Sequence, residues 1–134
     1  MALVLDSSVT MAWCFEDEAC DFTRYVLSRV VSEGARVPLI WQYEVANVLL
    51  LGERHSRIST ADSAEFLTLL AEQSIEIDDS PPDTALMLLA RKHRLTAYDA
   101  AYLELSVRKG LPLATLDMRL RKAASEEGLE LAGL

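Results

Sequence analysis

Short apolar runs alternate with longer segments of helical spacing along the whole chain. The first run, residues 2–5, is continuous and apolar, which is typical of a strand buried on both faces of a parallel sheet. Residues 36–39, 74–78 and 112–116 predict three further strands, and residues 129–131 are a candidate for a last one. The sheet is therefore expected to have about five strands.

Apolar positions at helical spacing fill the segments between these strands. Ser7 and Ser8, Ser59, and Ser80 followed by Pro81 stand where helix caps are expected, while Gly110 marks a helix end. The predicted helices span residues 9–15, 21–32, 40–51, 60–73, 80–92, 99–109 and 117–125. This alternation of strand and helix predicts a single α/β domain over residues 1–134, with a mainly parallel sheet and right-handed crossovers.

Four acids stand at positions that such a sheet brings together. Asp6 and Asp117 directly follow predicted strands, whereas Glu44 and Asp99 lie near the starts of predicted helices. In parallel α/β sheets these positions share the carboxyl edge, where ligands bind. Each acid alone is also an ordinary helix-capping choice, so the joint placement carries the prediction.

Carboxylates gathered without histidine or cysteine form an all-oxygen site, which suits Mg²⁺ or Mn²⁺. Such a cation orients a phosphodiester, lowers the pKa of an attacking water and neutralises the transition state. Ser8 and Thr115 are hydroxyl residues beside two of the acids, and Asn47 lies one helical turn after Glu44. We expect these three side chains to orient the carboxylates.

The composition and net charge disfavour some classes of function but do not identify one. The chain has 134 residues, of which 51% are hydrophobic, and a formal net charge of −8, which argues against a simple basic-surface nucleic-acid binder. A nuclease is not excluded, because bound cations would attract phosphate. The first apolar run stops at Asp6 without a basic leader, so we expect a cytoplasmic protein with no membrane contact.

Several motifs together resemble the PIN domain, specifically toxins of the VapC type. They are Leu3-Val4-Leu5-Asp6-Ser7-Ser8, Pro38-x5-Glu44-x2-Asn47-x-Leu49, Thr96-x-Tyr98-Asp99-Ala100-x-Tyr102 and Gly110-Leu111-Pro112-Leu113-Ala114-Thr115-x-Asp117. The resemblance implies a three-layer α/β/α sandwich and a Mg²⁺- or Mn²⁺-dependent endoribonuclease. Asp6, Glu44, Asp99 and Asp117 are implied as catalytic metal ligands, with Ser8 and Thr115 in support.

The resemblance also implies partners. Such toxins act on RNA and commonly form homodimers. They also assemble into hetero-oligomers with a VapB-type antitoxin, and DNA is contacted only through that antitoxin. Leu50, Leu51 and Phe66 lie on helices with more apolar surface than one buried face requires, so we expect an antitoxin segment or a second protomer to cover them. Arg94 and Arg119 are candidates for binding RNA phosphates.

Two other classes of function remain open from the residues. A receiver or phosphatase-like phosphoryl-transfer domain also has an aspartate after a strand, but the phosphatase signature has a second Asp where this chain has Ser8. A catalytically silent PIN-like module would use the acids as a polar surface. That module gains nothing from crowding like charges, so the nuclease is favoured.

Overall fold

The computed structural model describes residues 1–133, in which strands and helices alternate as the sequence predicts. In chain order the elements are β1 (Leu3–Leu5), α1 (Ser7–Cys14), the 3₁₀ turn η1 (Glu16–Glu18), α2 (Asp21–Glu33), β2 (Ala35–Pro38), α3 (Ile40–Arg54), α4 (Thr60–Ala71), β3 (Ile75–Asp78), α5 (Thr84–His93), α6 (Ala97–Lys109), β4 (Leu113–Ala114) and α7 (Met118–Glu126). All of the predicted helices form, with ends shifted by a few residues.

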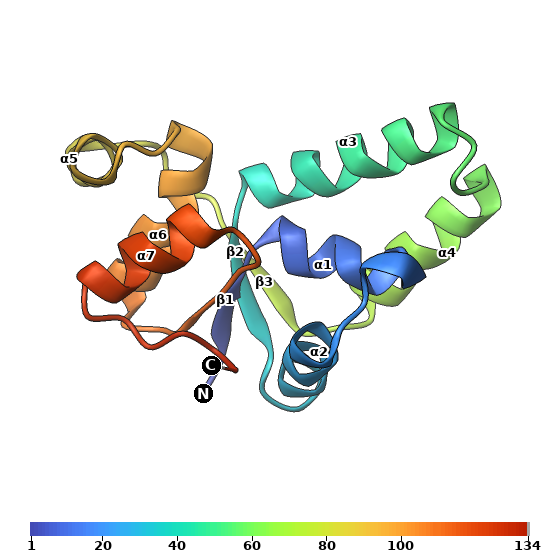
Figure 1. The fold of residues 1–134 in the computed structure, drawn as a ribbon, viewed down its shortest axis with the longest axis horizontal. Helices are drawn as coiled ribbons and strands as arrows, with labels where there is room; N and C mark the ends of the chain where they lie inside the picture. Colours follow the sequence, from blue (N-terminus) through green and yellow to red (C-terminus); the bar gives the residue numbers. More distant parts are fainter. Residues whose placement is uncertain (134) are drawn as a thin grey trace.

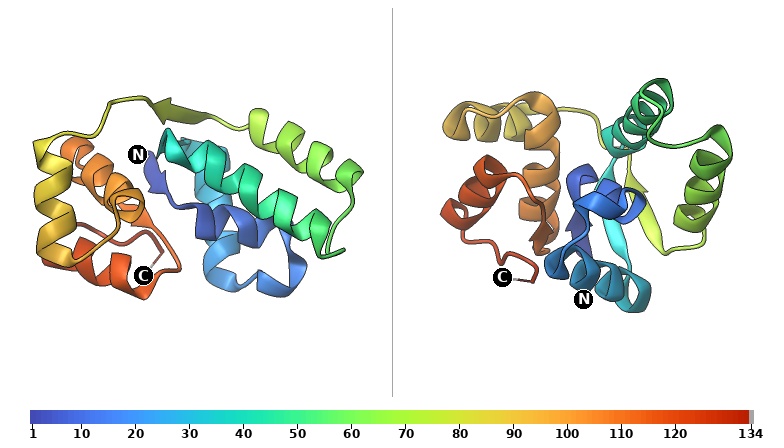
Figure 2. Two further views of the ribbon diagram at one scale, coloured as in Figure 1. Left: turned by 90° about the horizontal axis from the view of Figure 1, so that it is seen from above. Right: turned by 45° about the vertical axis from the view of Figure 1, so that its right-hand side comes forward.

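The sheet has four parallel strands in the order β3-β2-β1-β4, and it separates two layers of helices. In Figure 1, α5, α6 and α7 lie on one side of the sheet and α1 to α4 on the other, and Figure 2 shows the same division from two further directions. This confirms the three-layer α/β arrangement. It also differs from the strand order 2-1-3-4-5 that receivers share.

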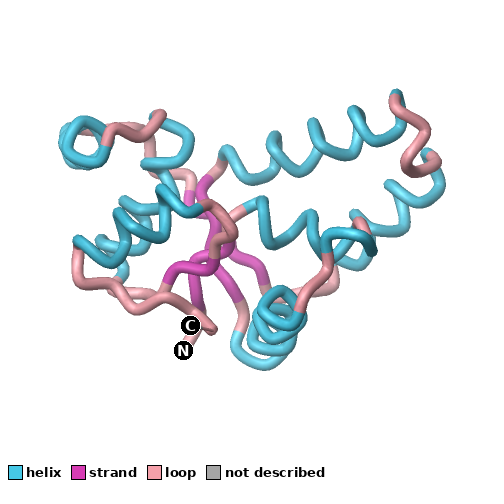
Figure 3. Tube along the Cα trace, viewed as in Figure 1, coloured by secondary structure: helices cyan, strands magenta, loops and turns pink. Residues whose placement is uncertain are grey.

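The expected fifth strand does not form. Leu131 makes only an isolated parallel bridge to Leu113, and Figure 3 draws the segment after α7 as a loop. The reason lies in β4, which is only two residues long, so a ladder on its outer side has nothing further to pair with. After β4 the chain turns away, and the carbonyl of Thr115 accepts a hydrogen bond from the Arg121 side chain (2.7 Å) instead.

The core lies on both faces of β1. Its three residues are completely buried, and Tyr102 and Leu103 of α6 are equally inaccessible on one side of them. Burial on both faces explains why the strand is a continuous apolar run. None of the helices over residues 1–133 has the length and apolar character that crossing a membrane requires.

Three helix starts differ from the expected ones by two residues or more; one of them is α6, which begins at Ala97 with Thr96 as its N-cap. Helix α1 begins at Ser7, with Asp6 in the N-cap position, so Ser7 and Ser8 are not its caps. Helix α5 begins at Thr84, where Asp83 caps the N–H of Leu86 (3.1 Å). Pro81 precedes Pro82 in the sequence and is therefore disfavoured in helical conformation, which delays the helix past both prolines. The predicted capping box at Ser59 is present.

Candidate functional site

Asp6 directly follows β1, one of the two inner strands, and is held by two hydroxyl groups. Its carboxylate oxygen Oδ2 accepts hydrogen bonds from Ser8 Oγ (2.6 Å) and from Thr115 Oγ1 (2.7 Å). The side chain does not cap α1, although the residue occupies the N-cap position, and only 6% of the residue is exposed. Asp6 is thus a buried carboxylate whose orientation is fixed by the two residues expected to orient it.

The same two hydroxyls also fix the loop that carries Asp117. The N–H of Leu116 donates to Ser8 Oγ (3.0 Å), and the N–H of Asp117 donates to Thr115 Oγ1 (3.0 Å). Each hydroxyl therefore accepts from the backbone and directs its own hydrogen to Asp6. The ends of β1 and β4 are joined by these contacts, so Asp6 and the start of α7 have fixed relative positions.

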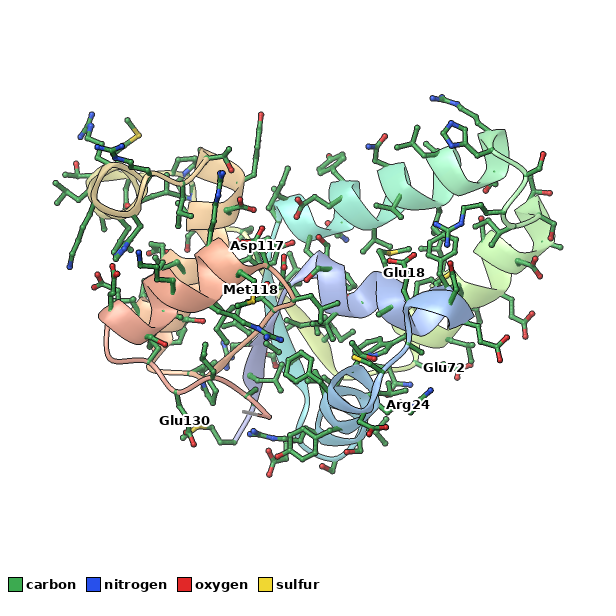
Figure 4. The ribbon with its side chains drawn as sticks, in the orientation of Figure 1. Glu18, Arg24, Glu72, Asp117, Met118 and Glu130 are labelled. Atoms are coloured by element: carbon green, nitrogen blue, oxygen red, sulfur yellow. The ribbon has the colours of Figure 1, made fainter. Side chains whose placement is uncertain are left out.

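Asp117 caps α7, and its charge acts on Asp6 and Asp99. Its Oδ1 accepts from the N–H of Leu120 (3.0 Å), as expected of an N-cap residue. Figure 4 labels Asp117 at the start of α7, beside Met118, which is exposed. Capping therefore uses only one of the two carboxylate oxygens of Asp117.

Glu44 and Asp99 come from helices on opposite sides of the sheet. Asp99 lies in the first turn of α6, where Thr96 caps the helix through the N–H of Asp99 (3.1 Å). Tyr102, one turn further along α6, donates its hydroxyl hydrogen to Glu44 Oε1. One helix thus carries Asp99 and also holds Glu44 in place. We call Asp6, Glu44, Asp99 and Asp117 together the acid site.

The charges of these acids act on one another. Burial raises the pKa of Asp6, Glu44 and Asp99, and it is the largest cause for each. The charge of Asp117 raises the pKa of Asp6 and Asp99 further, while Asp6 has the same effect on Glu44 and Asp99. Each of the four predicted acids is therefore within electrostatic reach of at least two of the others.

Within residues 1–133, no three Asp, Glu, His or Cys side chains already stand in a metal-ligating arrangement. The donor set nevertheless fits a hard divalent cation, because it consists of oxygen and contains no histidine or thiol. A cation would also lower the raised pKa values, which originate in burial and like charge. Asp6, Glu44, Asp99 and Asp117 are the residues that could hold it.

The other predicted residues divide into two groups. The guanidinium of Arg119 lies close enough to lower the pKa of Asp99, so it borders the acid site. Asn47 and Arg94 are exposed; Asn47 makes no hydrogen bond to Glu44 in the described structure, and Arg94 ends α5 in a left-handed conformation. Tyr102 was missed from the sequence, although its spacing of three residues from Asp99 on α6 was a usable signal.

The family model for the PIN domain matches residues 3–126, nearly the whole chain. The chain belongs to the PIN-domain family. No curated protein sequence matches this PIN domain.

Two solved structures share the fold of this PIN domain. PAE2754 from Pyrobaculum aerophilum is 24% identical, with a TM-score of 0.71 over 92% of this chain and 79% of that one. VapBC2 from Rickettsia felis, solved bound to a DNA fragment from its promoter, is 12% identical, with a TM-score of 0.64 over 98% of this chain and 97% of that one. At these identities the likeness to the two solved structures establishes the fold alone. Membership of the family supports a nuclease, because PIN domains are generally nucleases.

Proposed function

We propose that this PIN domain is a Mg²⁺- or Mn²⁺-dependent endoribonuclease that acts as the toxin of a VapBC-type pair. The observation that carries the proposal is the gathering of Asp6, Glu44 and Asp99, whose pKa values are raised by burial and by neighbouring carboxylates, around which Asp117 adds its charge. Partly buried like charges are unfavourable unless a cation joins them. Family membership makes a phosphodiester the substrate class.

The chain's own contacts define how the acids are held. Asp6 has Oδ2 committed to Ser8 and Thr115, Asp117 has Oδ1 committed to the start of α7, and Glu44 has Oε1 committed to Tyr102. We infer that the second oxygen of each is the one that would ligate the cation. Fixed ligands reduce the reorganisation that binding and catalysis require.

When bound, the divalent cation supplies charge neutralisation at the phosphodiester and a lowered pKa for the attacking water. Carboxylates in their ionised form would repel phosphate groups until a cation is bound. Arg119, next to Asp99, would orient a neighbouring phosphate of the RNA. These roles divide the site into acids that hold the cation and a basic residue at its border.

The partner proposal uses a different surface. Leu50 and Leu51 of α3 are 48% and 41% exposed, whereas Phe66 is partly buried against the core. The solved neighbour whose name includes both VapB and VapC supports an antitoxin as the partner. We propose that a VapB-type antitoxin or a second protomer covers Leu50 and Leu51, that DNA is contacted only through the antitoxin, and that the protein acts in the cytoplasm.

The direct test is cleavage of total RNA by the purified protein with Mg²⁺ or Mn²⁺ and with EDTA. We expect internal cuts that require the metal and disappear in Asp6→Asn. Asp21→Asn is the matched control, because Asp21 is exposed and pairs only with Arg24 among the described residues. Cleavage that survives both EDTA and Asp6→Asn would exclude the proposed mechanism. Growth arrest on expression, relieved by a neighbouring antitoxin gene, tests the toxin role.

A further inference from the structure

A hollow of about 450 Å³ opens between the ends of β2 and β3 and the first turns of α3 and α6, and none of the four acids lines it. Its wall is mostly apolar and includes Leu39, Pro82, Leu86 and Ala101. Figure 1 shows the first turns of α3 and α6 facing each other above the sheet. Cavities of this volume are typical of sites that take a small planar or drug-sized group.

Two tyrosines connect the hollow to the acid site. Tyr43 directly precedes Glu44 on α3, and Tyr98 directly precedes Asp99 on α6. Both residues line the hollow, and they remain 67% and 61% exposed. Each helix thus contributes one acid to the acid site and an adjacent ring to the hollow. A ligand that spans the hollow and the acid site would therefore contact an acid and a ring of the same helix.

The charges of the hollow exclude a phosphate. The one basic residue in its wall is Arg108, which is paired with Asp78 (3.0 Å) and with Glu104 (2.7 Å). We call these three residues the Arg108 cluster. Asp79 and Asp83 add further carboxylates at the rim. An anionic backbone would therefore be repelled, whereas an uncharged aromatic group would not.

We propose that the hollow is a subsite for one unpaired nucleobase of the RNA, held against the rings of Tyr43 and Tyr98. The adjoining phosphate would then lie at the acid site. This inference rests on the proposed function for the class of its ligand. Single-stranded RNA is commonly recognised through splayed bases that stack on aromatic side chains, and such stacking tolerates different bases.

A second copy of the chain is the competing occupant. A stable dimer buries about 800 Å² on each partner, so its interface would extend far beyond a hollow of this size. The sequence adjacency of the two rings to Glu44 and Asp99 has no role in a dimer contact, but it follows directly if one nucleotide occupies both places. The nucleobase is therefore the favoured occupant.

The test measures binding without cleavage. The anisotropy of a fluorescein-labelled RNA hexanucleotide is recorded with Ca²⁺ in place of Mg²⁺, which occupies the acid site without supporting cleavage, for the wild type, Tyr43→Leu and Tyr98→Leu. Loss of one stacked base should weaken binding roughly 5- to 150-fold, while the phenylalanine variants stay within about 2-fold of the wild type. Tyr25→Leu on α2 is the matched control, because Tyr25 is also exposed and lies outside the hollow.

An abasic scan of the same hexanucleotide locates the base. At one position, removing the base should weaken wild-type binding as much as Tyr98→Leu does and should not weaken the variant further. Equal losses for wild type and variant at every position would overturn the subsite. So would leucine variants that bind like the wild type.

The outcomes separate this inference from the proposed function. RNA cleavage by the wild type together with unchanged binding by the leucine variants would overturn the subsite and leave the function standing. Tyrosine-dependent binding without any metal-dependent cleavage would do the reverse. If sedimentation shows that Tyr98→Leu turns a dimer into a monomer with unchanged RNA affinity per protomer, the hollow is a subunit interface and the subsite is overturned.

Discussion

Two groups of acids lie at the carboxyl edge of this sheet, and they differ in what balances their charge. In the Arg108 cluster, Asp78 accepts two hydrogen bonds from one guanidinium, and this holds the pKa of Asp78 well below its ordinary value. In the acid site, burial raises the pKa of Asp6, Glu44 and Asp99. The carboxylates of the Arg108 cluster are neutralised by a guanidinium of the chain itself. We expect those of the acid site to be neutralised by a cation from solution.

Helix α6 contributes residues to both groups of acids. Its first turns carry Asp99 and Tyr102 for the acid site, and its later turns carry Glu104 and Arg108. The two groups therefore share an element, a sheet edge and a class of side chain. Clustered acids therefore indicate function only where the fold does not provide their counter-charge.

The largest expected effect is on catalysis. Asp99→Asn removes one carboxylate from the acid site, and we expect kcat for metal-dependent RNA cleavage to fall by at least about 100-fold, the scale seen when one preorganised stabilising group is lost. The measurement is a single-turnover assay in saturating Mg²⁺, with Asp21→Asn as the control. A loss of less than about 3-fold would remove Asp99 from the catalytic group.

A smaller effect is expected from the residue that holds Glu44. Tyr102→Phe deletes a hydroxyl that donates to Glu44 and leaves the ring in the core. Because partners that orient ligands contribute about 10- to 100-fold, both the Mn²⁺ affinity and kcat should fall by that range. Tyr25→Phe is the control. Unchanged Mn²⁺ affinity in Tyr102→Phe would limit Tyr102 to packing.

Stability without metal should move in opposite directions in the two groups. Asp78→Asn breaks a partly exposed, two-bond ion pair, so we expect a loss of about 1 kcal/mol of unfolding free energy. Asp6→Asn keeps an oxygen for Ser8 and Thr115 and removes a buried charge, so its melting temperature at neutral pH should not fall. Thermal melts in EDTA measure both variants. A lower melting temperature for Asp6→Asn than for the wild type would contradict the claim that the buried charge of Asp6 is unfavourable without metal.

The pH dependence of these melts has opposite signs as well. Because the folded-state pKa of Asp6 is raised, the fold binds more protons than the unfolded chain, and wild-type stability should fall relative to Asp6→Asn as the pH rises above the ordinary value of 3.8. Because the pKa of Asp78 is lowered, the advantage of the wild type over Asp78→Asn should disappear as the pH falls below 3.8. Parallel curves would refute the assignment.

The smallest effect concerns Arg119 at the border of the acid site. If its guanidinium contacts one RNA phosphate, Arg119→Gln should reduce the slope of log Kd against log salt by about 0.7, the value for one contact with a single strand. Arg24→Gln is the control, since Arg24 pairs with Asp21 on α2. An identical slope in Arg119→Gln and the wild type would show that Arg119 is merely solvated.

The sequence was sufficient for the parts of the molecule governed by local pattern. Asp6 and Asp117 follow strands, and the parallel topology then brings Glu44 and Asp99 to the same edge. The hydroxyls of Ser8 and Thr115 were predicted because they are close in sequence to the acids. The alternation of strand and helix was likewise enough for the layers.

What the sequence did not predict depends on contacts between distant segments. Asn47 shares a helix with Glu44 but faces solvent, and only the packing of α3 decides which face is buried. The fifth strand fails because β4 is short, which no pattern in residues 129–131 reveals. The hollow between Tyr43 and Tyr98 likewise requires two helices to be placed before it exists.

The most direct test of the account is Mn²⁺ binding to the protein without RNA, measured by electron paramagnetic resonance. We expect the wild type and Asp78→Asn to bind Mn²⁺ with the same affinity, and Asp6→Asn and Asp99→Asn to lose at least about 10-fold. Equal affinity in the wild type, Asp6→Asn and Asp99→Asn would contradict the claim that the acid site takes its counter-charge from a divalent cation.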